Sequence, residues 1–260
     1  MSPSATPQAV NCPTFSPLPL DHSLTLPGIY DHHAEHSPNH PVFAYTDENG
    51  KSSTVTYLEA SQNFHSIAHS VVSKHLDAVK EVNPVVAILA ASGASIVFLV
   101  VILIFSIDTL SYAYTMLAIM SLGATAFPLS LRNTAAITAH LLKTTGSTMV
   151  FVSSDETMQK LAQQAVDSLA NEGIQVHIVP MATPADWAVR AASDIPLRSK
   201  DMDEDNVAVI LHSSGQLSLS KSFFSFSTGT TALPKPIRIT KKGLRNLSNI
   251  PCVLLITSEN

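Results

Sequence analysis

The sequence predicts an α/β fold built around a largely parallel sheet. Short apolar runs rich in β-branched residues, such as Val85–Leu89, have the length and composition of strands buried on both faces. Segments with apolar residues at helical spacing lie between those runs, and turn residues separate the two kinds of segment. Strands that alternate with helices in this way are typical of a parallel sheet covered by helices.

The first part of the chain predicts a leader, a helix and a hairpin. Residues 1–27 are rich in Pro, Ser and Thr, which predicts a disordered or loosely attached leader before a domain over 28–260. A short surface helix is expected to end before Ser37-Pro38. Pro41–Tyr45 and Ser53–Val55 then form the two strands of a hairpin, because Asp47–Gly50 is a strong turn sequence.

Helices and strands are expected to alternate along the rest of the domain. Thr56 and Glu59 have the spacing of a capping box, which predicts an amphipathic helix that continues to about Leu76. Ser153 and Glu156 are expected to cap another helix, which Gly173 ends after Asn171. The remaining predicted helices cover 110–127 and 134–142, the latter with Gly146 as its C-cap, and the predicted strands cover 84–90, 148–152, 174–179 and 206–211.

Composition excludes some classes of function. Charged residues make up 13% of the chain, about half the usual share for a soluble domain, and the formal net charge is −5. Nucleic acid is therefore not expected as a partner, because phosphate backbones are bound by clustered Lys and Arg. The N-terminus lacks a secretory signal and the two cysteines, Cys12 and Cys252, lie far apart, so free thiols and a cytoplasmic location are expected.

A cluster of histidines raises the question of a metal site. His22, His32, His33, His36 and His40 lie close together in the sequence, and a helix would place His32 and His36 on one face. No complete ligand set follows from Cys or from the nearby acidic residues. We therefore predict no metal site and interpret the segment as an ordinary surface helix.

The strongest functional pattern is the segment Phe226–Pro236, in which small hydroxyl residues surround a glycine and a lysine follows. A glycine allows backbone N–H groups to face an anion, hydroxyl groups add donors, and a lysine neutralises phosphate charge. The spacing is not that of a Walker A loop. The predicted ATP-phosphate ligands are Ser213, Ser214, Thr228, Gly229, Thr230, Thr231 and Lys235.

This segment resembles the phosphate-binding signature of the adenylate-forming (AMP-binding) superfamily, which includes acyl-CoA synthetases, luciferases and adenylation domains of nonribosomal peptide synthetases. The signature departs from the family at Ala232, where Gly or Ser is usual. Thr56–Glu59 resembles the family's "T-Y-x-E" helix start, and Gly123–Ser130 resembles its "G-A-x-x-x-P" segment. The resemblance covers roughly residues 28–250 and is closest in style to fungal carboxylic-acid-reductase-like enzymes.

The resemblance implies a function and a fold. Such ligases use ATP and Mg²⁺ to convert a small carboxylic acid into an acyl-adenylate, and the acyl group then passes to CoA or to a phosphopantetheine carrier. The chain would be an incomplete N-terminal subdomain of that fold. Because nothing in it matches the family's ribose-binding aspartate or C-terminal lysine, and no catalytic residue can be assigned, this polypeptide is expected to be inactive.

Two segments depart from the family pattern. An intensely apolar stretch at 94–106 separates a predicted strand from a predicted helix that Asp108 would cap, and residues 215–228 separate Ser213-Ser214 from Gly229. Deleting the second segment leaves a nearly complete signature. We hypothesise that both are translated introns or gene-model errors; transcript reads that span both in frame would contradict this.

A membrane protein is the alternative interpretation. Residues 85–107 carry no charge over 23 positions, which is long enough for a transmembrane helix. Flanking Lys and Arg are sparse, and the start of this stretch also has the pattern of a strand. A membrane location therefore stays as the alternative to the cytoplasmic one.

Overall fold

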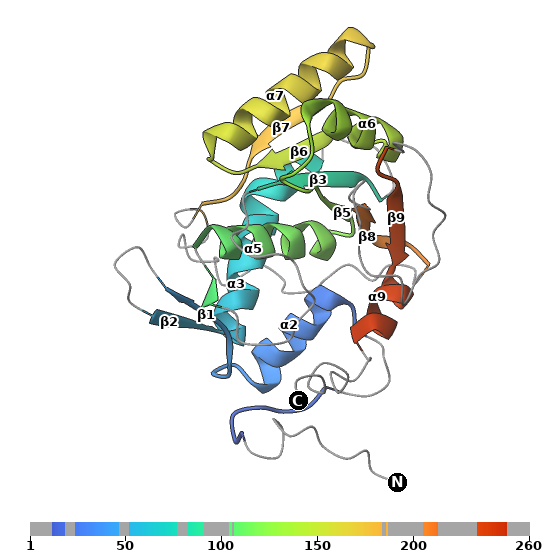
Figure 1. Ribbon diagram of the computed structural model, residues 1–260. Helices are drawn as coiled ribbons and strands as arrows, with labels where there is room; N and C mark the ends of the chain where they lie inside the picture. Colours follow the sequence, from blue (N-terminus) through green and yellow to red (C-terminus); the bar gives the residue numbers. More distant parts are fainter. Residues whose placement is uncertain are drawn as a thin grey trace, which may run out of the picture.

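A six-stranded sheet forms the centre of the protein (Figure 1). The computed structural model describes residues 12–18, 24–46, 52–76, 83–90, 104–105, 107–183, 186, 205–212 and 233–248. The strand order is β7 (His177–Pro180), β6 (Met149–Val152), β3 (Val85–Leu89), β5 (Thr125–Pro128), β8 (Val207–His212) and β9 (Pro236–Thr240). The first five strands are parallel and β9 is antiparallel to β8, which confirms the predicted largely parallel sheet.

Helices cover both faces of this sheet. The helices of the described residues are α2 (Leu26–His36), α3 (Tyr57–Ile67), the π-helical segment η1 (Ala68–Val72), α4 (Ser73–Leu76), α5 (Ile107–Ser121), α6 (Ala135–Thr145), α7 (Glu156–Asn171) and α9 (Lys241–Ser248). Figure 1 shows α3 and α5 on one side of the sheet and α6 and α7 on the other.

Strand β3 explains why both faces need helices. Val86 and Ile88 point into the core formed with α3 and α5, whereas Ala87 and Leu89 point into the core formed with α6 and α7. Side chains of a strand alternate between the faces of a sheet, so a strand covered on both sides must be apolar at every position. This is the physical reason for the continuous apolar run that predicted the strand.

A smaller sheet lies beside α3. Strands β1 (Pro41–Thr46) and β2 (Ser52–Thr56) pair antiparallel, which confirms the predicted hairpin. Strand β4 (Ile104–Phe105) pairs parallel with β1, through Ala44 opposite Ile104. The end of the apolar segment 94–106 therefore takes part in this sheet, whereas residues 94–103 lie outside the described part of the chain.

Local capping agrees with the sequence in two helices. Thr56 and Glu59 form the predicted capping box at the start of α3: the Glu59 backbone N–H donates to Thr56 Oγ1 at 3.3 Å, and the Thr56 N–H donates to Glu59 Oε2 at 2.8 Å. Gly146 ends α6 with a φ of 71°, a left-handed conformation that glycine adopts without a steric penalty.

Three expectations about helices were wrong. The helix expected over 110–127 ends at Ser121, because Gly123 has a φ of 86° and the Ala124 N–H donates to the Ile119 carbonyl in a C-terminal cap. Its last expected residues instead form β5. Helix α7 is capped by Asp155 and not by Ser153, since Asp155 Oδ1 accepts the N–H groups of Thr157 and Met158. Helix α5 begins at Ile107, so Asp108 lies inside its first turn.

A transmembrane helix over 85–107 is also contradicted at its start. The backbone of Val85–Leu89 pairs with β5 on one side and β6 on the other, so it belongs to the sheet. In the described ranges, no helix combines the length and the apolar character needed to cross a membrane.

The expected leader takes part in the fold where it is described. Helix α2 begins at Leu26, and its N-cap Thr25 accepts the Gly28 N–H at 3.2 Å. Residues 12–18 lie against this helix: the Ser16 N–H donates to Ser37 Oγ at 2.8 Å, and the Phe15 ring stacks on His33. Residues 12–18 and 24–27 therefore depart from the disordered leader expected over 1–27.

The capping box predicts a measurable contribution to stability. Thr56→Ala removes the hydroxyl acceptor at the N-terminus of α3, so the free energy of unfolding in urea should fall by about 1 kcal/mol. Gln62→Ala, an exposed change in the same helix, is the matched control and should leave stability within about 0.5 kcal/mol. Equal stability of both variants would show that the cap contributes nothing.

Candidate functional site

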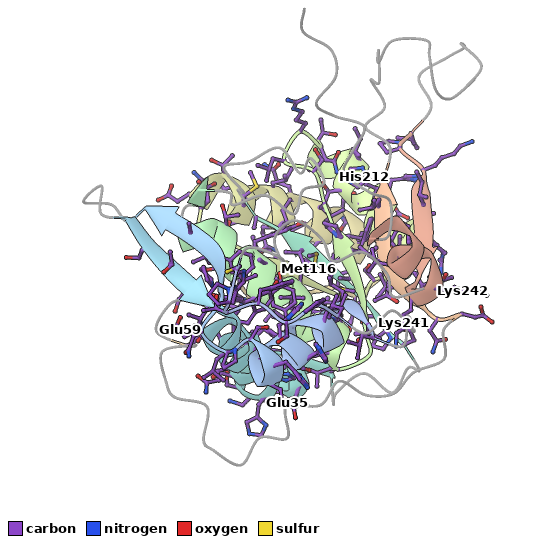
Figure 2. The ribbon with its side chains drawn as sticks, turned by 90° about the horizontal axis from the view of Figure 1, so that it is seen from below. Glu35, Glu59, Met116, His212, Lys241 and Lys242 are labelled. Atoms are coloured by element: carbon purple, nitrogen blue, oxygen red, sulfur yellow. The ribbon has the colours of Figure 1, made fainter. Side chains whose placement is uncertain are left out.

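The carboxyl ends of the parallel strands meet at one edge of the central sheet. Ligands of open α/β sheets bind outside this edge, where the loops after the strands gather. Strand β8 ends there at His212, and the predicted phosphate loop begins at the next residue. Figure 2 shows His212 at the opposite end of β9 from Lys241 and Lys242, which follow the last residue of β9.

Most of the predicted phosphate ligands lie outside the described residues. This holds for Ser213 and Ser214 and for all of Thr228–Thr231, and also for the segment 215–228 expected as an insertion. Lys235 is described, and it lies exposed immediately before β9. The structure therefore gives the position of one of the seven predicted ligands, together with both ends of the loop.

Strand pairing brings the two ends of the loop together. His212 is the register partner of Pro236 in the antiparallel pair of β8 and β9. Residues directly opposite each other in such a pair have Cα atoms about 5 Å apart. The end of β8 at His212 and the start of β9 at Pro236, which directly follows Lys235, are consequently neighbours in the sheet, although they are far apart in the sequence.

His212, which the sequence indicates as the last residue before the loop, was not among the predicted ligands. Its Nε2 accepts the Ser130 backbone N–H at 3.0 Å and lies 3.4 Å from Nδ2 of Asn133. Its ring meets Phe127 edge-on, with centroids 6.1 Å apart. The sequence places His212 at the end of an apolar strand and directly before Ser213-Ser214, but its contact with the segment after β5 is not encoded locally.

A cation lies near the edge where β8 ends. Lys235 is close to the end of β8, whereas Lys241 and Lys242 lie beyond the other end of β9. The Lys241 N–H donates to the Asn206 carbonyl, at the start of β8. A lysine beside a glycine-containing loop can neutralise phosphate oxygens while backbone N–H groups supply hydrogen bonds.

The histidine cluster on α2 is a packing feature in this structure. His33 is 2% exposed, and its ring lies between Phe15 and Tyr57, with centroid separations of 4.8 and 4.5 Å. His32 and His36 stack on each other at 4.1 Å. Across the described ranges, which leave out His22, no group of three His, Cys, Asp or Glu side chains could hold a metal ion.

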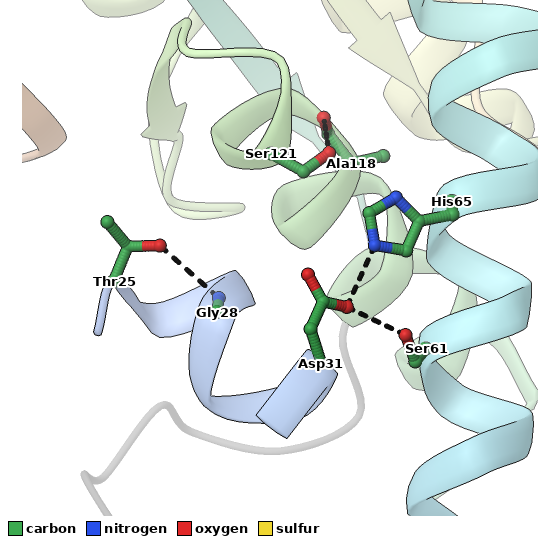
Figure 3. A network of polar contacts seen from close by, with 7 residues as sticks. All are labelled: Thr25, Gly28, Asp31, Ser61, His65, Ala118 and Ser121. Carbon is green, nitrogen blue, oxygen red and sulfur yellow. Dashed lines mark hydrogen bonds and ion pairs between the residues drawn. The ribbon is translucent and has the colours of Figure 1, made fainter. Parts of the chain in front are cut away.

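Asp31, on the same helix, bonds to α3 and not to the histidines beside it. Asp31 Oδ1 accepts hydrogen bonds from Ser61 Oγ at 2.7 Å and from His65 Nε2 at 2.8 Å (Figure 3). Ser61 and His65 are both buried, so this carboxylate satisfies two polar groups that would otherwise be costly to bury. The network joins α2 to α3 and lies away from the edge where β8 ends.

The chain resembles adenylate-forming enzymes in its sequence. The family described as "AMP-binding enzyme" matches residues 100–216, from before β4 to beyond β8. The adenylate-forming reductase Nps10 of Heterobasidion annosum is 28% identical over 250 residues, which cover 94% of this chain and 21% of that protein. This chain therefore spans about a fifth of the length of that relative.

Solved structures show the same fold. A Mycobacterium tuberculosis fatty acyl CoA synthetase superposes with a TM-score of 0.56 at 16% identity, over 84% of this chain and 34% of that one. The Klebsiella oxytoca NpsA N-terminal subdomain, in complex with 3-hydroxybenzoyl-AMSN, superposes with a TM-score of 0.52 at 16% identity, over 84% of this chain and 41% of that one.

These comparisons confirm the resemblance predicted from the phosphate-loop segment. The fold is that of the N-terminal subdomain of adenylate-forming enzymes, and the similarity to a fungal adenylate-forming reductase agrees with the expected reductase-like type.

Packing around His33 predicts a pH-dependent stability. Burial, and then the neighbouring His32, His40 and His36, lower the pKa of His33 to about 4 from 6.5. The unfolded chain binds a proton at His33 more tightly than the folded chain does. The stability that comes from holding His33 neutral in the folded chain is therefore complete above pH 6.5 and is lost as the pH falls toward 4. Urea unfolding between pH 7 and 4 should show a loss on the order of 2 kcal/mol from this residue.

His33→Phe keeps an aromatic ring in the stack and removes the titrating group. The variant should therefore lose less stability than the parent chain over the same pH range. His69→Gln, a change of an exposed histidine on η1, is the control and should preserve the parent slope. An unchanged slope in His33→Phe would assign the acid sensitivity to other groups.

Proposed function

We propose that this chain forms the ATP-phosphate-binding part of an adenylate-forming domain that activates a small carboxylic acid. The observation that carries the proposal is the pairing of His212 with Pro236, because it brings the two ends of the predicted loop together at the carboxyl edge of the sheet. The match to AMP-binding enzymes over 100–216, which includes β8 and the start of the loop, supports it.

The proposed reaction depends on neutralising phosphate charge. The substrate carboxylate attacks the α-phosphorus of ATP, pyrophosphate leaves, and an acyl-adenylate forms. Lys235 and the backbone N–H groups of the loop over Thr228–Thr231 would hold the β- and γ-phosphates, and so stabilise the charge that develops on the leaving pyrophosphate. Mg²⁺ would be bound largely through the phosphates, as is usual for this ion.

The later steps of the proposed function use a thiol acceptor. The acyl group would pass to CoA or to the phosphopantetheine arm of a carrier protein, and the protein would act in the cytoplasm. The relative Nps10 is named an adenylate-forming reductase, which agrees with the reductase-like type expected from the sequence.

The length of the loop bears on activity. Fourteen residues, Gly215–Thr228, separate Ser213-Ser214 from Gly229. We infer that this segment keeps the hydroxyls of Ser213 and Ser214 from binding the phosphates held by Thr230 and Lys235. The 260-residue polypeptide should therefore catalyse no carboxylate-dependent exchange of pyrophosphate into ATP, and exchange with any carboxylic acid would overturn this inference.

Removing this segment should strengthen ATP binding. Nine residues would then connect His212 to Pro236, and nine residues close a hairpin easily because the two strand ends are already paired. Calorimetric titration with MgATP should give a higher affinity for the chain lacking Gly215–Thr228 than for the intact chain. Equal affinities would mean that the segment does not disturb the site.

Lys235 provides the sharper test of the site itself. Lys235→Ala should weaken ATP binding about tenfold in either chain, because a charge-assisted contact to phosphate contributes roughly 1.5 to 3 kcal/mol. Lys160→Ala is the matched control: Lys160 is exposed on α7 and pairs only loosely with Glu156, with 3.7 Å between Nζ and Oε2. Similar effects of the two variants would contradict a phosphate contact by Lys235.

A further inference from the structure

A thiol, a hydroxyl and an imidazole meet where residues 12–18 contact the connection between α2 and β1. Cys12 Sγ lies 3.2 Å from Thr14 Oγ1, and Thr14 Oγ1 lies 3.0 Å from His40 Nδ1. Cys12 Sγ is also 3.5 Å from that nitrogen, a distance at which a thiol can donate. The fold therefore brings a nucleophile to a base that is 28 residues away in the chain.

The chemistry of this group is that of an activated thiol. Cys12 is a free cysteine and is partly exposed. The thiolate is the nucleophilic form of cysteine, and a base within hydrogen-bond reach activates the thiol by removing its proton. In the tautomer that leaves Nδ1 without a proton, His40 can take the proton of Cys12 directly. It can also take it through the Thr14 hydroxyl, which accepts one proton and gives up another.

The base is held in place by rings and by its backbone. The centroid of the Phe15 ring lies 4.9 Å from that of His40, and the Tyr57 ring stacks on His40 at 6.1 Å with 17° between the planes. The His40 N–H donates to the Ser37 carbonyl at 3.0 Å, and the His40 carbonyl accepts the Tyr57 N–H at 3.0 Å. The imidazole is therefore positioned before it accepts a proton.

Residues 12–18, the N-terminal strap, cover a polar atom that has no partner. The strap is held by the Ser16 N–H, which donates to Ser37 Oγ at 2.8 Å, and by the Phe15 ring on His33. Within the described part of the chain, Nδ1 of His33 has no hydrogen-bond partner, although this residue is only 2% exposed. A buried nitrogen without a partner is costly. Lifting the strap would let water reach His33, and this hydration would offset part of the cost of release.

We propose that Cys12 is a site of reversible thiolation, at which its thiol exchanges with a small disulfide and His40 acts as the general base. His40 Nδ1 takes the thiol proton, and Sγ attacks one sulfur of the disulfide. The S–S bond of the disulfide breaks as the new bond to Sγ forms, and the leaving thiolate takes the proton back from His40. Cys12 is oxidised to a mixed disulfide and the departing half is reduced to a thiol, so the disulfide is the only oxidant needed. The proposal does not depend on ATP binding.

Thiolation would also release the strap. A mixed disulfide has no thiol proton to donate, and it adds bulk at a sulfur that lies close to both Thr14 Oγ1 and His40 Nδ1. The strap can then no longer keep its contacts with His40. The site therefore couples the redox state of small thiols to the packing of residues 12–18 on α2.

The rate of thiolation tests the base. The 260-residue chain is treated with oxidised glutathione at pH 7, and mass spectrometry follows the peptide that contains Cys12 separately from the one that contains Cys252. His40→Ala should react about tenfold more slowly, since a positioned base accelerates proton transfer by at least that factor. Imidazole added to the buffer should restore much of the rate. His36→Ala is the matched control and should react like the parent, because His36 is exposed and its Nδ1 contacts the His32 carbonyl.

A second variant separates loss of the base from loosening of the strap. Ser37→Ala removes the acceptor of the Ser16 N–H and keeps His40, so its rate of thiolation should equal or exceed that of the parent. The role of His40 is overturned if His40→Ala reacts as fast as the parent. It is also overturned if Ser37→Ala is slowed as much as His40→Ala, or if imidazole does not accelerate His40→Ala.

Amide hydrogen exchange tests the release of the strap. Peptides covering 12–18 should exchange faster once Cys12 carries glutathione, and dithiothreitol should restore the slower exchange. In Cys12→Ser, which keeps a donor beside Thr14 and cannot form a mixed disulfide, oxidised glutathione should leave the exchange of these peptides unchanged. Unchanged exchange in the fully thiolated parent would show that the strap stays in place and would overturn its release.

Discussion

The burial of β3 between two helical layers is the constraint on which the rest of the structure depends. Its neighbours β5 and β6 pair with it in parallel, so every backbone group of Val86–Ile88 lies inside the sheet. Parallel strands require crossover connections, and these connections are the helices that cover both faces. Once β3 is central, the carboxyl ends of β5, β6 and β8 must lie at one edge, since all three run in its direction.

This edge is where the fold and the candidate function meet. The loop after β8 leaves the sheet at His212 and returns at Pro236, beside Lys235. A parallel strand followed by an antiparallel one places both ends of their connection at the same edge. The two ends of a long connecting segment are therefore brought close together by strand pairing alone.

On α2, side chains of the types that bind metals contact other side chains of the protein. The histidines there have the spacing of metal ligands, yet His33 is buried between aromatic rings and His32 stacks on His36. Asp31 points to Ser61 and His65 on α3. The acidic residue and the histidines beside it thus serve different contacts, and the local sequence contains nothing that distinguishes these roles.

The sequence by itself determined the elements whose causes are local. The capping box at Thr56, the left-handed Gly146 and the doubly buried run Val85–Leu89 follow from neighbouring residues, and each was predicted. The sequence did not determine the exact ends of two helices. Asp155 and not Ser153 caps α7, and α5 ends before Gly123 although the apolar pattern continues beyond it.

Only the tertiary structure decided which distant residues meet. His212 and Ser130 are separated by 82 positions in the chain, and their hydrogen bond exists because β5 and β8 are adjacent in the sheet. The nearness of Lys235 to the end of β8 has the same origin. Strand order is a property of the whole packed domain, so no local pattern could reveal these contacts, whereas the phosphate-loop residues stay a prediction that rests on their local order in the sequence.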